Sequence, residues 1–381
     1  MRRFLPPRTH APTAAAVAVV WAMILLAGCG SRGDAGPTAS TPPSAESPAT
    51  LKAAPPEVTA PAKEPCREPH PAAGSATTPL TNGGGWLELP TYDGSGQLTH
   101  MNVQFKAEGR FGHRYWMTMT PYPFGEDSKE NPSILASDNG LDWITPPGLT
   151  NPVSGVPSDV DAGGHYSDGY LLPRPNGFEL WFRANPAKPK GHRPDNSTNI
   201  IYRMTSPDGI SWSDKTVVFN GGGPSYMSPS LLADGPSYRL WYTNYGGHMV
   251  HTRSHDLAEW AAPEDVDVAL GDGYIPWHQE VIQTEEGFEA LILGSKKTED
   301  RPKFALYHAR SADGLRFGQA SMIDPVKVDP RLDGYQFYKS SLVKSCGSYQ
   351  LYLSVISPKR AFNAFYKQVK AEDLASLFAG P

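Results

Sequence analysis

A short turn motif recurs five times after residue 130, and its spacing constrains the fold more than any other feature of the chain. Four copies follow the pattern Ser-x-Asp-x-x-x-Trp, with Asn for Asp in one and Phe for Trp in another, and a fifth is degenerate; they begin at Ser137, Ser206, Ser254, Ser311 and Ala371. Successive copies start 48 to 69 residues apart, a spacing typical of propeller blades with variable loops. Such a turn joins two strands, and its aromatic side chain packs back between neighbouring blades.

A β-rich run precedes each copy of the motif. These runs are Arg114–Thr120, Phe178–Arg183, Tyr238–Asn244, Phe288–Leu293 and Tyr349–Val355. No apolar period of 3.6 residues persists beyond a turn or two, which argues against a helical repeat. The sequence therefore predicts an all-β domain over residues 83–381, a five-bladed β-propeller with four-stranded antiparallel blades around a central funnel. Because a propeller closes by pairing both chain ends, we expect Trp86 to Leu89 to complete the last blade.

The first 28 residues have the composition of an export signal. Three arginines precede an apolar stretch of 13 residues, 14–26, which is shorter than the roughly 20 residues of a membrane-spanning helix. The stretch ends in Leu26-Ala27-Gly28-Cys29, which resembles a bacterial lipobox. The resemblance implies cleavage before Cys29 and attachment of a lipid (palmitate in the usual case) to that residue. We therefore expect an extracytoplasmic protein anchored to the cell membrane only by its lipid; an ordinary signal peptide is the alternative.

Residues 29–82 are rich in Pro, Ala, Ser and Thr, with almost no large apolar side chains. Such a segment buries too little surface to offset its chain entropy, so we expect a disordered tether. Besides Cys29 the chain has Cys66 and Cys346, which in an oxidising compartment are expected to form a disulfide, with two unpaired thiols as the alternative. The formal net charge of −5 gives no reason to expect nucleic-acid binding. We expect a monomer.

Polar residues open the innermost strand of every blade. These strands can be aligned by an apolar pair such as Leu171-Leu172. Three residues before each pair stand His100, Asp168, Ser228, His278 and Lys339, and one residue before it stand Asn102, Tyr170, Ser230, Glu280 and Ser341. Because side chains two apart on a strand share a face, we expect two stacked rings around the channel. A structural core rarely holds so many ionisable groups, so the rings indicate a functional site.

From residue 86 onward the chain resembles the five-bladed glycoside hydrolases of family 43 and their relatives in families 32, 62 and 68. The resemblance rests on blade number, blade length, the turns, the polar residues of the inner strands, and the segments Met119-Thr120-Pro121-Tyr122-Pro123 and Glu130-Asn131-Pro132-Ser133-Ile134. It implies a base Asp on blade one, a pKa-tuning Asp on blade two and an acid Glu on blade three. Here blade two keeps Asp168, but blade one offers His100 and blade three offers Ser228.

These departures from the family pattern leave the chemistry open. Glycoside hydrolysis needs a proton donor and a base or nucleophile about 5–9.5 Å apart. Glu280 as acid, with Asp168 or His100 as base, would supply them, and Glu130 is a further candidate. His100, Asp168, His278 and Glu280 would also make a metal site, and the resemblance implies Ca²⁺ bound in the channel with help from a histidine.

Loops between the second and third strands should lie on the same face as the entrance to the channel. The substrate-binding residues expected on that face, from inner strands and loops together, are His278, Lys339, Glu130, Asn131, Arg183, Tyr122 and Trp277. Basic residues gather in the same loops of blades two, four and five, which would suit an anionic glycan; they are Lys188, Lys190, His192, Arg193, Lys296, Lys297, Arg301, Lys303, Lys359 and Arg360.

The sequence thus favours a surface-tethered glycosidase that acts on an extracellular or cell-envelope polysaccharide. Two other interpretations stay open. One is a non-catalytic propeller that binds a glycan or a protein, and the other is a metal-dependent enzyme of another class, such as a lyase or a phosphodiester hydrolase.

Overall fold

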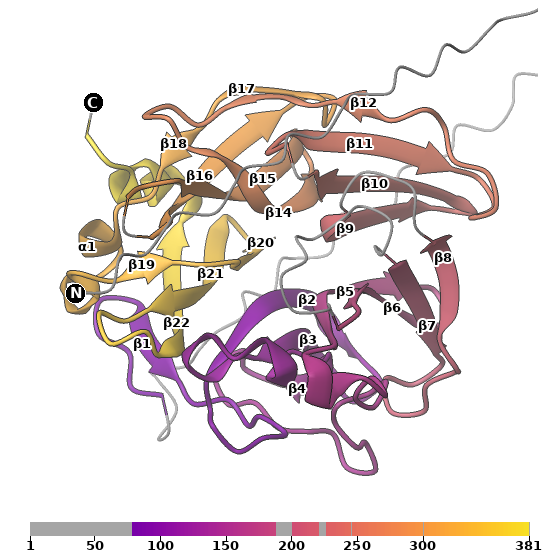
Figure 1. Cartoon of the computed structure of the whole chain (residues 1–381). Coiled ribbons are helices and arrows are strands. Elements are labelled where there is room, and N and C mark those ends of the chain that lie inside the picture. Colours follow the sequence, from indigo (N-terminus) through magenta and orange to yellow (C-terminus); the bar gives the residue numbers. More distant parts are fainter. Residues whose placement is uncertain (1–77, 188–199, 221–225, 245, 300, 381) are drawn as a thin grey trace, which may run out of the picture. The chain divides into compact units, whose positions relative to one another are not determined.

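The computed structural model describes residues 78–187, 200–220, 226–244, 246–299 and 301–380, which form a five-bladed β-propeller (Figure 1). Blade one contains β2 (Leu98–Arg110), β3 (His113–Pro121) and β4 (Ser133–Ser137). An isolated bridge between Ala136 and Ile144 takes the place of its fourth strand. Blade two contains β5 (His165–Arg174), β6 (Gly177–Asn185), β7 (Ile200–Ser206) and β8 (Thr216–Asn220).

Blades three and four repeat the same antiparallel order. Blade three contains β9 (Met227–Asp234), β10 (Ser237–Thr243), β11 (Met249–Ser254) and β12 (Glu264–Asp265). Blade four contains β14 (Ile275–Thr284), β15 (Gly287–Lys296), β16 (Lys303–Ser311) and β18 (Ser321–Met322). The short strands β13 (Asp267–Ala269) and β17 (Arg316–Gln319) pair in parallel beside them.

Blade five closes the ring with strands from both ends of the domain. Its inner strand is split into β19 (Gln336–Phe337) and β20 (Ser341–Ser345), and both parts pair with β21 (Ser348–Ile356). Outside these lie β22 (Phe362–Lys370) and β1 (Gly84–Leu87), with Trp86 opposite Phe365. Figure 1 shows the indigo β1 against the yellow β22. The expected closing strand is confirmed, although it ends at Leu87 rather than Leu89.

The helical elements are short and lie in the connections. They are α1 (Pro325–Val328) and the 3-10 turns η1 (Pro123–Gly125), η2 (Asp127–Lys129), η3 (Val160–Ala162), η5 (Pro330–Leu332) and η6 (Ala371–Leu377). Within the described ranges, no helix is long and apolar enough to cross a membrane. The fifth, degenerate copy of the turn motif folds as η6, whose Leu374 and Leu377 are buried.

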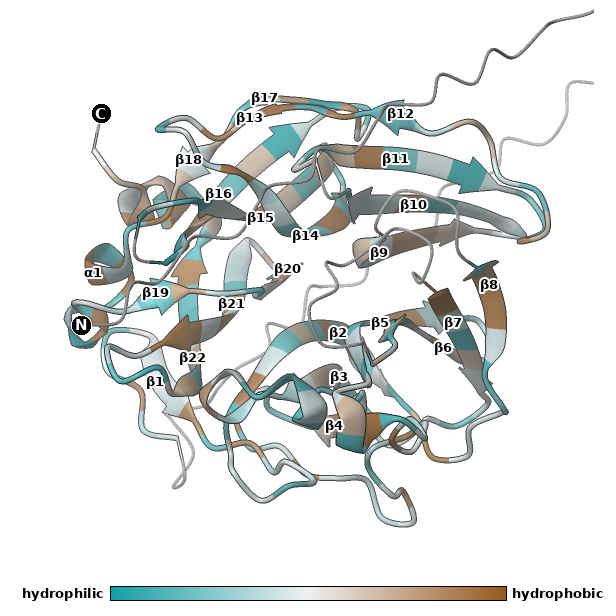
Figure 2. Ribbon diagram, viewed as in Figure 1, coloured by the Kyte–Doolittle hydropathy of each residue, from teal (hydrophilic) through white to brown (hydrophobic). Residues whose placement is uncertain are grey.

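The core lies between neighbouring blades, where apolar side chains of adjacent sheets meet. Residues of opposite hydropathy alternate along many strands (Figure 2). One contact repeats at all five junctions between blades. Each second strand has an aromatic residue near its start, and the residue that follows it contacts the corresponding aromatic residue of the next blade. The pairs are Trp116–Phe178, Glu179–Tyr238, Arg239–Phe288, Glu289–Tyr349 and Gln350–Tyr115. The last pair joins blade five to blade one.

The repeated turns are held by their own side chains and packed against the preceding blade. In blade two Ser206 Oγ accepts from Gly209 N, and Asp208 Oδ1 accepts from Ile210 N and Ser211 N. Gly209 has a φ of +79°, and a Cβ there would lie 2.5 Å from the Trp116 ring. The motif therefore serves turn geometry and blade packing, as its sequence suggested.

Candidate functional site

All five inner strands are irregular at the same level of the channel. In β2, β5 and β9 two residues face one residue of the neighbouring strand, and the first of each two is His100, Asp168 or Ser228, with φ of 55°, 57° and 51°. The register of β14 shifts just before His278, and Lys339 lies in the break between β19 and β20. Such bulges re-aim side chains and are strained, which is common next to functional sites.

The five residues at these irregular positions form what we call the upper ring: His100, Asp168, Ser228, His278 and Lys339. Asp168 is its centre. The Oδ1 atom of Asp168 lies 3.3 Å from His100 Nε2 and 3.3 Å from His278 Nδ1, and it accepts a hydrogen bond from Ser228 Oγ at 3.3 Å. Ser228 Oγ also lies 2.7 Å from His278 Nδ1. The structure thus brings His100, Asp168 and His278 together as the sequence predicted, and all three are buried.

Arg183 neutralises Asp168 from the other side. Its Nε lies 2.8 Å from Asp168 Oδ2. Burial alone would raise the pKa of Asp168, but the charge of Arg183, together with the contacts to His100 and His278, holds that pKa well below its usual range. Burial lowers the pKa of His100 and of His278. The centre therefore holds an ionised carboxylate between two neutral imidazoles near pH 7.

The far side of His100 meets the end of β3 and the loop that follows it. Nδ1 of His100 lies 2.9 Å from Thr120 Oγ1 and 3.6 Å from Glu130 Oε2. Glu130 is 5% exposed, and burial, with the nearby charge of Asp168, raises its pKa well above its usual range. The sequence predicts Glu130 in a loop at the entrance to the channel; in the structure its side chain is buried against the upper ring.

Tyr338 and the expected Trp277 lie beside His278, and the expected Tyr122 contacts Tyr338. Tyr338 OH is 3.3 Å from His278 Nε2, and the Tyr338 ring stacks on Tyr122 with centroids 6.3 Å apart. Trp277 is half-buried, and its ring centroid lies 5.9 Å from that of His278. Asn131 is fully buried and donates to Tyr92 OH at 3.1 Å, a contact that holds the loop.

Glu280 lies apart from this centre, in what we call the lower ring: Asn102, Tyr170, Ser230, Glu280 and Ser341. Its Oε1 accepts from Asn102 Nδ2 and Ser341 Oγ, and its Oε2 accepts from Leu342 N at 2.7 Å. These donors belong to blades one and five, so the carboxyl group of blade four ties three blades together. Burial raises the pKa of Glu280 to about 7. Both oxygens of Glu280, which the sequence predicts as the catalytic acid, are thus already bonded to protein donors.

Other residues expected from the sequence are either exposed or lie outside the described ranges. Lys297, Arg301, Lys303, Lys359 and Arg360 are exposed, and Lys296 is half-buried. Arg360 lies at the loop of blade one, since a Cβ on Gly125 would be 3.6 Å from its guanidinium. Lys188, Lys190, His192, Arg193, Cys29 and Cys66 lie outside the described residues.

The upper ring has the donor set of a metal site. One ligand atom each from His100, Asp168 and His278 lies within 4.8 Å of the others, and His100 Nε2 has no hydrogen-bond partner among the described residues. Two neutral imidazoles and a carboxylate suit zinc or another first-row metal. Ca²⁺ prefers six to eight oxygen ligands, so the residues fit a transition metal better than the calcium expected from the sequence.

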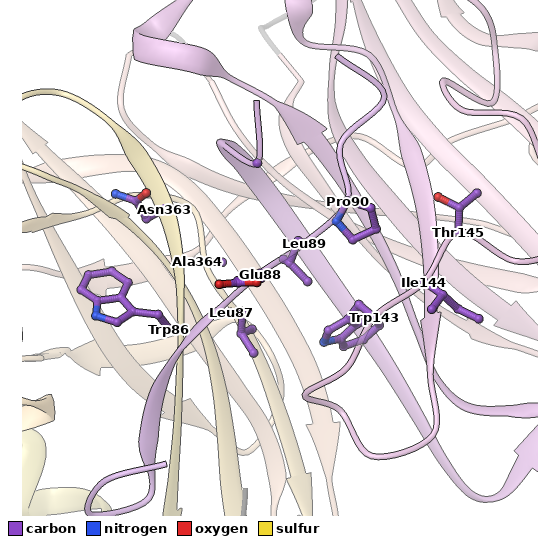
Figure 3. Close-up of a pocket in the computed structure, with 11 residues that line it drawn as sticks. Trp86, Leu87, Glu88, Leu89, Pro90, Trp143, Ile144, Thr145, Asn363 and Ala364 are labelled. Carbon is purple, nitrogen blue, oxygen red and sulfur yellow. The ribbon is translucent and has the colours of Figure 1, made fainter. Parts of the chain in front are cut away.

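A cavity of about 790 Å³ lies elsewhere, at the outer edge between blades five and one. Trp86, Leu89, Trp143 and Ile144 line it together with Glu88 (Figure 3). None of the upper-ring residues is part of its lining, so it does not belong to the site.

Three further residues lie at or near the centre, and the sequence assigned none of them a catalytic or binding role. Ser228 occupies the place of the expected acid Glu and bonds to both Asp168 and His278. Thr120 could have been found from its position two residues before Tyr122, at the end of the second strand. His165 opens β5, and the charges of Asp168 and Arg183 affect its pKa, which burial lowers; the spacing His-x-x-Asp was a signal for it.

Comparisons with known proteins come from sequence and from structure. No family model matches the chain. The A type blood N-acetyl-α-D-galactosamine deacetylase of Flavonifractor plautii is 24% identical over 330 residues, which cover 73% of this chain and 42% of that protein. The chain thus spans less than half the length of this curated relative.

Solved structures with the same architecture include two carbohydrate-active enzymes. The F. plautii N-acetylgalactosamine deacetylase, in complex with blood group B trisaccharide, has a TM-score of 0.60 at 18% identity over 77% of this chain and 96% of that chain. The exo-β-1,3-galactanase of Phanerochaete chrysosporium has a TM-score of 0.50 at 12% identity over 78% and 66%. The chain therefore has the five-bladed propeller fold of glycoside hydrolases and a carbohydrate deacetylase, which confirms the resemblance seen in its sequence.

Proposed function

We propose that this propeller is a metal-dependent hydrolase that removes the acetyl group from an N-acetylated sugar residue of an extracellular glycan. The observation that carries the proposal is the buried cluster of His100, Asp168 and His278, whose ligand atoms lie within 4.8 Å of one another. The activity named for the F. plautii relative, N-acetylgalactosamine deacetylation, supports this reaction class. We therefore propose amide hydrolysis, rather than glycoside hydrolysis, as the reaction at this site.

The placement of the carboxyl groups argues against the glycosidase expected from the sequence. That mechanism needs two carboxyl groups with free oxygens on either side of the scissile bond. Asp168 is paired with Arg183, and both oxygens of Glu280 accept hydrogen bonds from protein donors. The inner strand of blade one offers His100 where the family has its Asp.

The residues of the cluster would hold the metal, and their partners orient them. A divalent metal there would supply Lewis acidity, which polarises an amide carbonyl and lowers the pKa of water. Arg183 fixes Asp168 from behind at 2.8 Å. If Thr120 accepts the Nδ1–H of His100, the Nε2 lone pair faces the cluster, an arrangement typical of metal-ligating histidines.

In the proposed mechanism Glu130 transfers the proton. Its Oε2 lies 3.6 Å from His100 Nδ1 at the edge of the cluster. In amide hydrolysis the water oxygen bonds to the carbonyl carbon, the C–N bond breaks, and acetate and a free amine result. A carboxylate beside the attacking water can take its proton and give it to the leaving nitrogen. The rings of Tyr122 and Tyr338 would hold the sugar.

The proposal also covers where the protein is located and what charge its substrate carries. A lipid on Cys29 would tether the domain to the outer face of the cell membrane, and Cys29→Ala should move the protein from the membrane to the soluble fraction. The exposed Lys359 and Arg360 would favour an anionic glycan. If so, Arg360→Ala should slow hydrolysis of anionic substrates more than of neutral ones.

The central test measures acetate and new reducing ends separately. The purified protein is incubated with glycans bearing N-acetylgalactosamine or N-acetylglucosamine, before and after chelation and after return of Zn²⁺, Mn²⁺ or Ca²⁺. We expect acetate without new reducing ends, loss on chelation, and restoration by a transition metal. Asp168→Asn should abolish acetate release, whereas the control His255→Gln, an exposed histidine bonded to Ser237, should not.

Other outcomes would overturn the proposal. Reducing ends without acetate would establish a glycosidase. Glycan binding with neither product would establish a binding propeller, and acetate release that survives chelation would exclude the metal.

A further inference from the structure

Lys339 is the member of the upper ring that the proposed mechanism does not use. It lies in the break of the inner strand of blade five, and its side chain is 2% exposed. The flanking backbone is held in place, since Tyr338 N donates to Ser354 O and Ser340 Oγ donates to Tyr338 O. The side chain is therefore fixed beside the channel rather than free to extend into solvent.

The ammonium group of Lys339 has no hydrogen-bond partner among the residues that the structure describes. The other four members of the ring contact one another through Asp168 and Ser228. The two carboxylates whose charges reach Lys339 are Glu280 and Asp168. Glu280 is bonded to Ser341 and Leu342, and Asp168 is paired with Arg183, so the donors of the ammonium are unused.

A second buried lysine in the same blade shows the ordinary arrangement. Lys367 of β22 is 8% exposed, and its Nζ donates to Asn82 O at 2.8 Å. A buried charge without hydrogen bonds destabilises a fold, so such groups are commonly paired. Lys339 does not follow this rule within the described residues, although it belongs to the ring that lines the channel.

We propose that Lys339 is an oxyanion-binding residue of this site, which takes the carbonyl oxygen of the acyl group that is hydrolysed and then an oxygen of the carboxylate product. The inference rests on the proposed function. When the water oxygen bonds to the carbonyl carbon, the carbonyl electron pair moves to the oxygen, and the ammonium donates a hydrogen bond to that negative charge. When the C–N bond breaks the pair returns, the amine leaves with a proton, and Lys339 keeps its own proton throughout.

Donors aimed at a charge that develops in the transition state act mainly on turnover. We therefore expect Lys339→Met, which keeps the length of the side chain, to lower kcat for acetate release about 100- to 1,000-fold while KM changes little. Because this substitution removes an unpaired buried charge, the melting temperature of the Lys339→Met variant should equal or exceed that of the wild type. The control Lys367→Met should do the opposite, with a lower melting temperature and unchanged kcat.

Binding of acetate tests the oxyanion role without any turnover. Calorimetric titration of sodium acetate into chelator-treated protein should show binding to the wild type and to Lys367→Met, and loss of binding in Lys339→Met and Lys339→Gln. The glutamine variant serves if the methionine variant fails to fold. Equal metal content in wild type and variants would show that the cluster is intact.

Two results would overturn the inference: a kcat for Lys339→Met within threefold of the wild type, or acetate binding that is the same with and without the lysine. Failure of the proposed deacetylase activity would give a different experimental result. A wild type that releases no acetate from any glycan but binds acetate through Lys339 would leave the oxyanion site standing and remove the deacetylase.

Discussion

The hydroxyl oxygen of Thr120 lies 2.9 Å from Nδ1 of His100, across the hairpin of β2 and β3. The contact decides which ring nitrogen of His100 is free. If Nδ1 carries the proton and donates it to Thr120, Nε2 faces Asp168, which lies 3.3 Å away. A threonine at the end of the second strand thus orients an imidazole of the channel.

Removing this hydroxyl should weaken metal binding without disturbing the fold. Thr120→Val has nearly the same shape, and loss of such an orienting partner typically costs about 10- to 100-fold in metal affinity. The measurement is competition with a chromogenic zinc chelator. The control is Thr99→Val, because Thr99 pairs with Thr120 across the strands and its buried hydroxyl has no partner among the described residues. Equal affinities in the two variants would contradict the orienting role.

Glu280→Gln should reduce stability more than turnover. The carboxylate accepts from Ser341, Leu342 and Asn102, and an amide would set an N–H against one of these donors. We expect the free energy of unfolding to fall by about 1–3 kcal/mol, measured by urea denaturation, with kcat for acetate release within tenfold of the wild type. A large loss of kcat at unchanged stability would restore Glu280 as a catalytic acid.

The contact between blades four and five at Glu289 should make the domain sensitive to acid. Burial alone would raise the pKa of Glu289, but hydrogen bonds from His308, Lys344 and Tyr349 lower it from 4.5 to about 2. A carboxyl with a depressed pKa stabilises the fold above its unfolded pKa, and this contribution is lost as the pH falls from 4.5 towards 2.

Glu289→Gln should therefore lower the free energy of unfolding at pH 7 and flatten its decline between pH 4.5 and pH 3. Urea denaturation at several pH values measures both effects. Glu286→Gln is the matched control, since Glu286 bonds to the same Lys344 but is fully exposed. A wild-type slope in Glu289→Gln would show that other groups dominate acid unfolding.

Deletion of residues 84–92 should abolish cooperative unfolding. The deletion removes β1, whose four residues pair with β22, and the Trp86 ring that meets Phe365 edge-on at 5.1 Å. Without β1 the outer edge of blade five is exposed. Thermal unfolding followed by near-ultraviolet circular dichroism measures the effect, and an unchanged transition would show that the strand is dispensable.

The disulfide between Cys66 and Cys346 stays a prediction, because Cys66 lies outside the described residues. Cys346 is in the tight turn between β20 and β21. Thiol titration of the denatured, unreduced mature protein should find neither cysteine reactive. Two reactive thiols would remove the disulfide, and Cys346→Ser would then leave the melting temperature unchanged.

Local sequence patterns were sufficient to predict the architecture and the residues that line the channel. The spacing of the Ser-x-Asp turns specified five blades, since a turn of local hydrogen bonds such as Ser206 with Gly209 is encoded within a few residues. The apolar pair of each inner strand placed His100, Asp168 and His278 at one level, because the two-residue period of a strand is a local property.

Which of these side chains contact one another depends on how the strands and blades pack. The bulges at His100, Asp168 and Ser228 depend on pairing with a second strand, so the residues of one strand alone do not predict them. Glu130 reaches His100 from a loop, whereas Glu280, two residues from His278, bonds to other blades instead. The hydrogen-bond partners of Glu280 come from other blades. The distances between blades depend on closure of the whole ring, so the neighbouring residues in the sequence do not determine them.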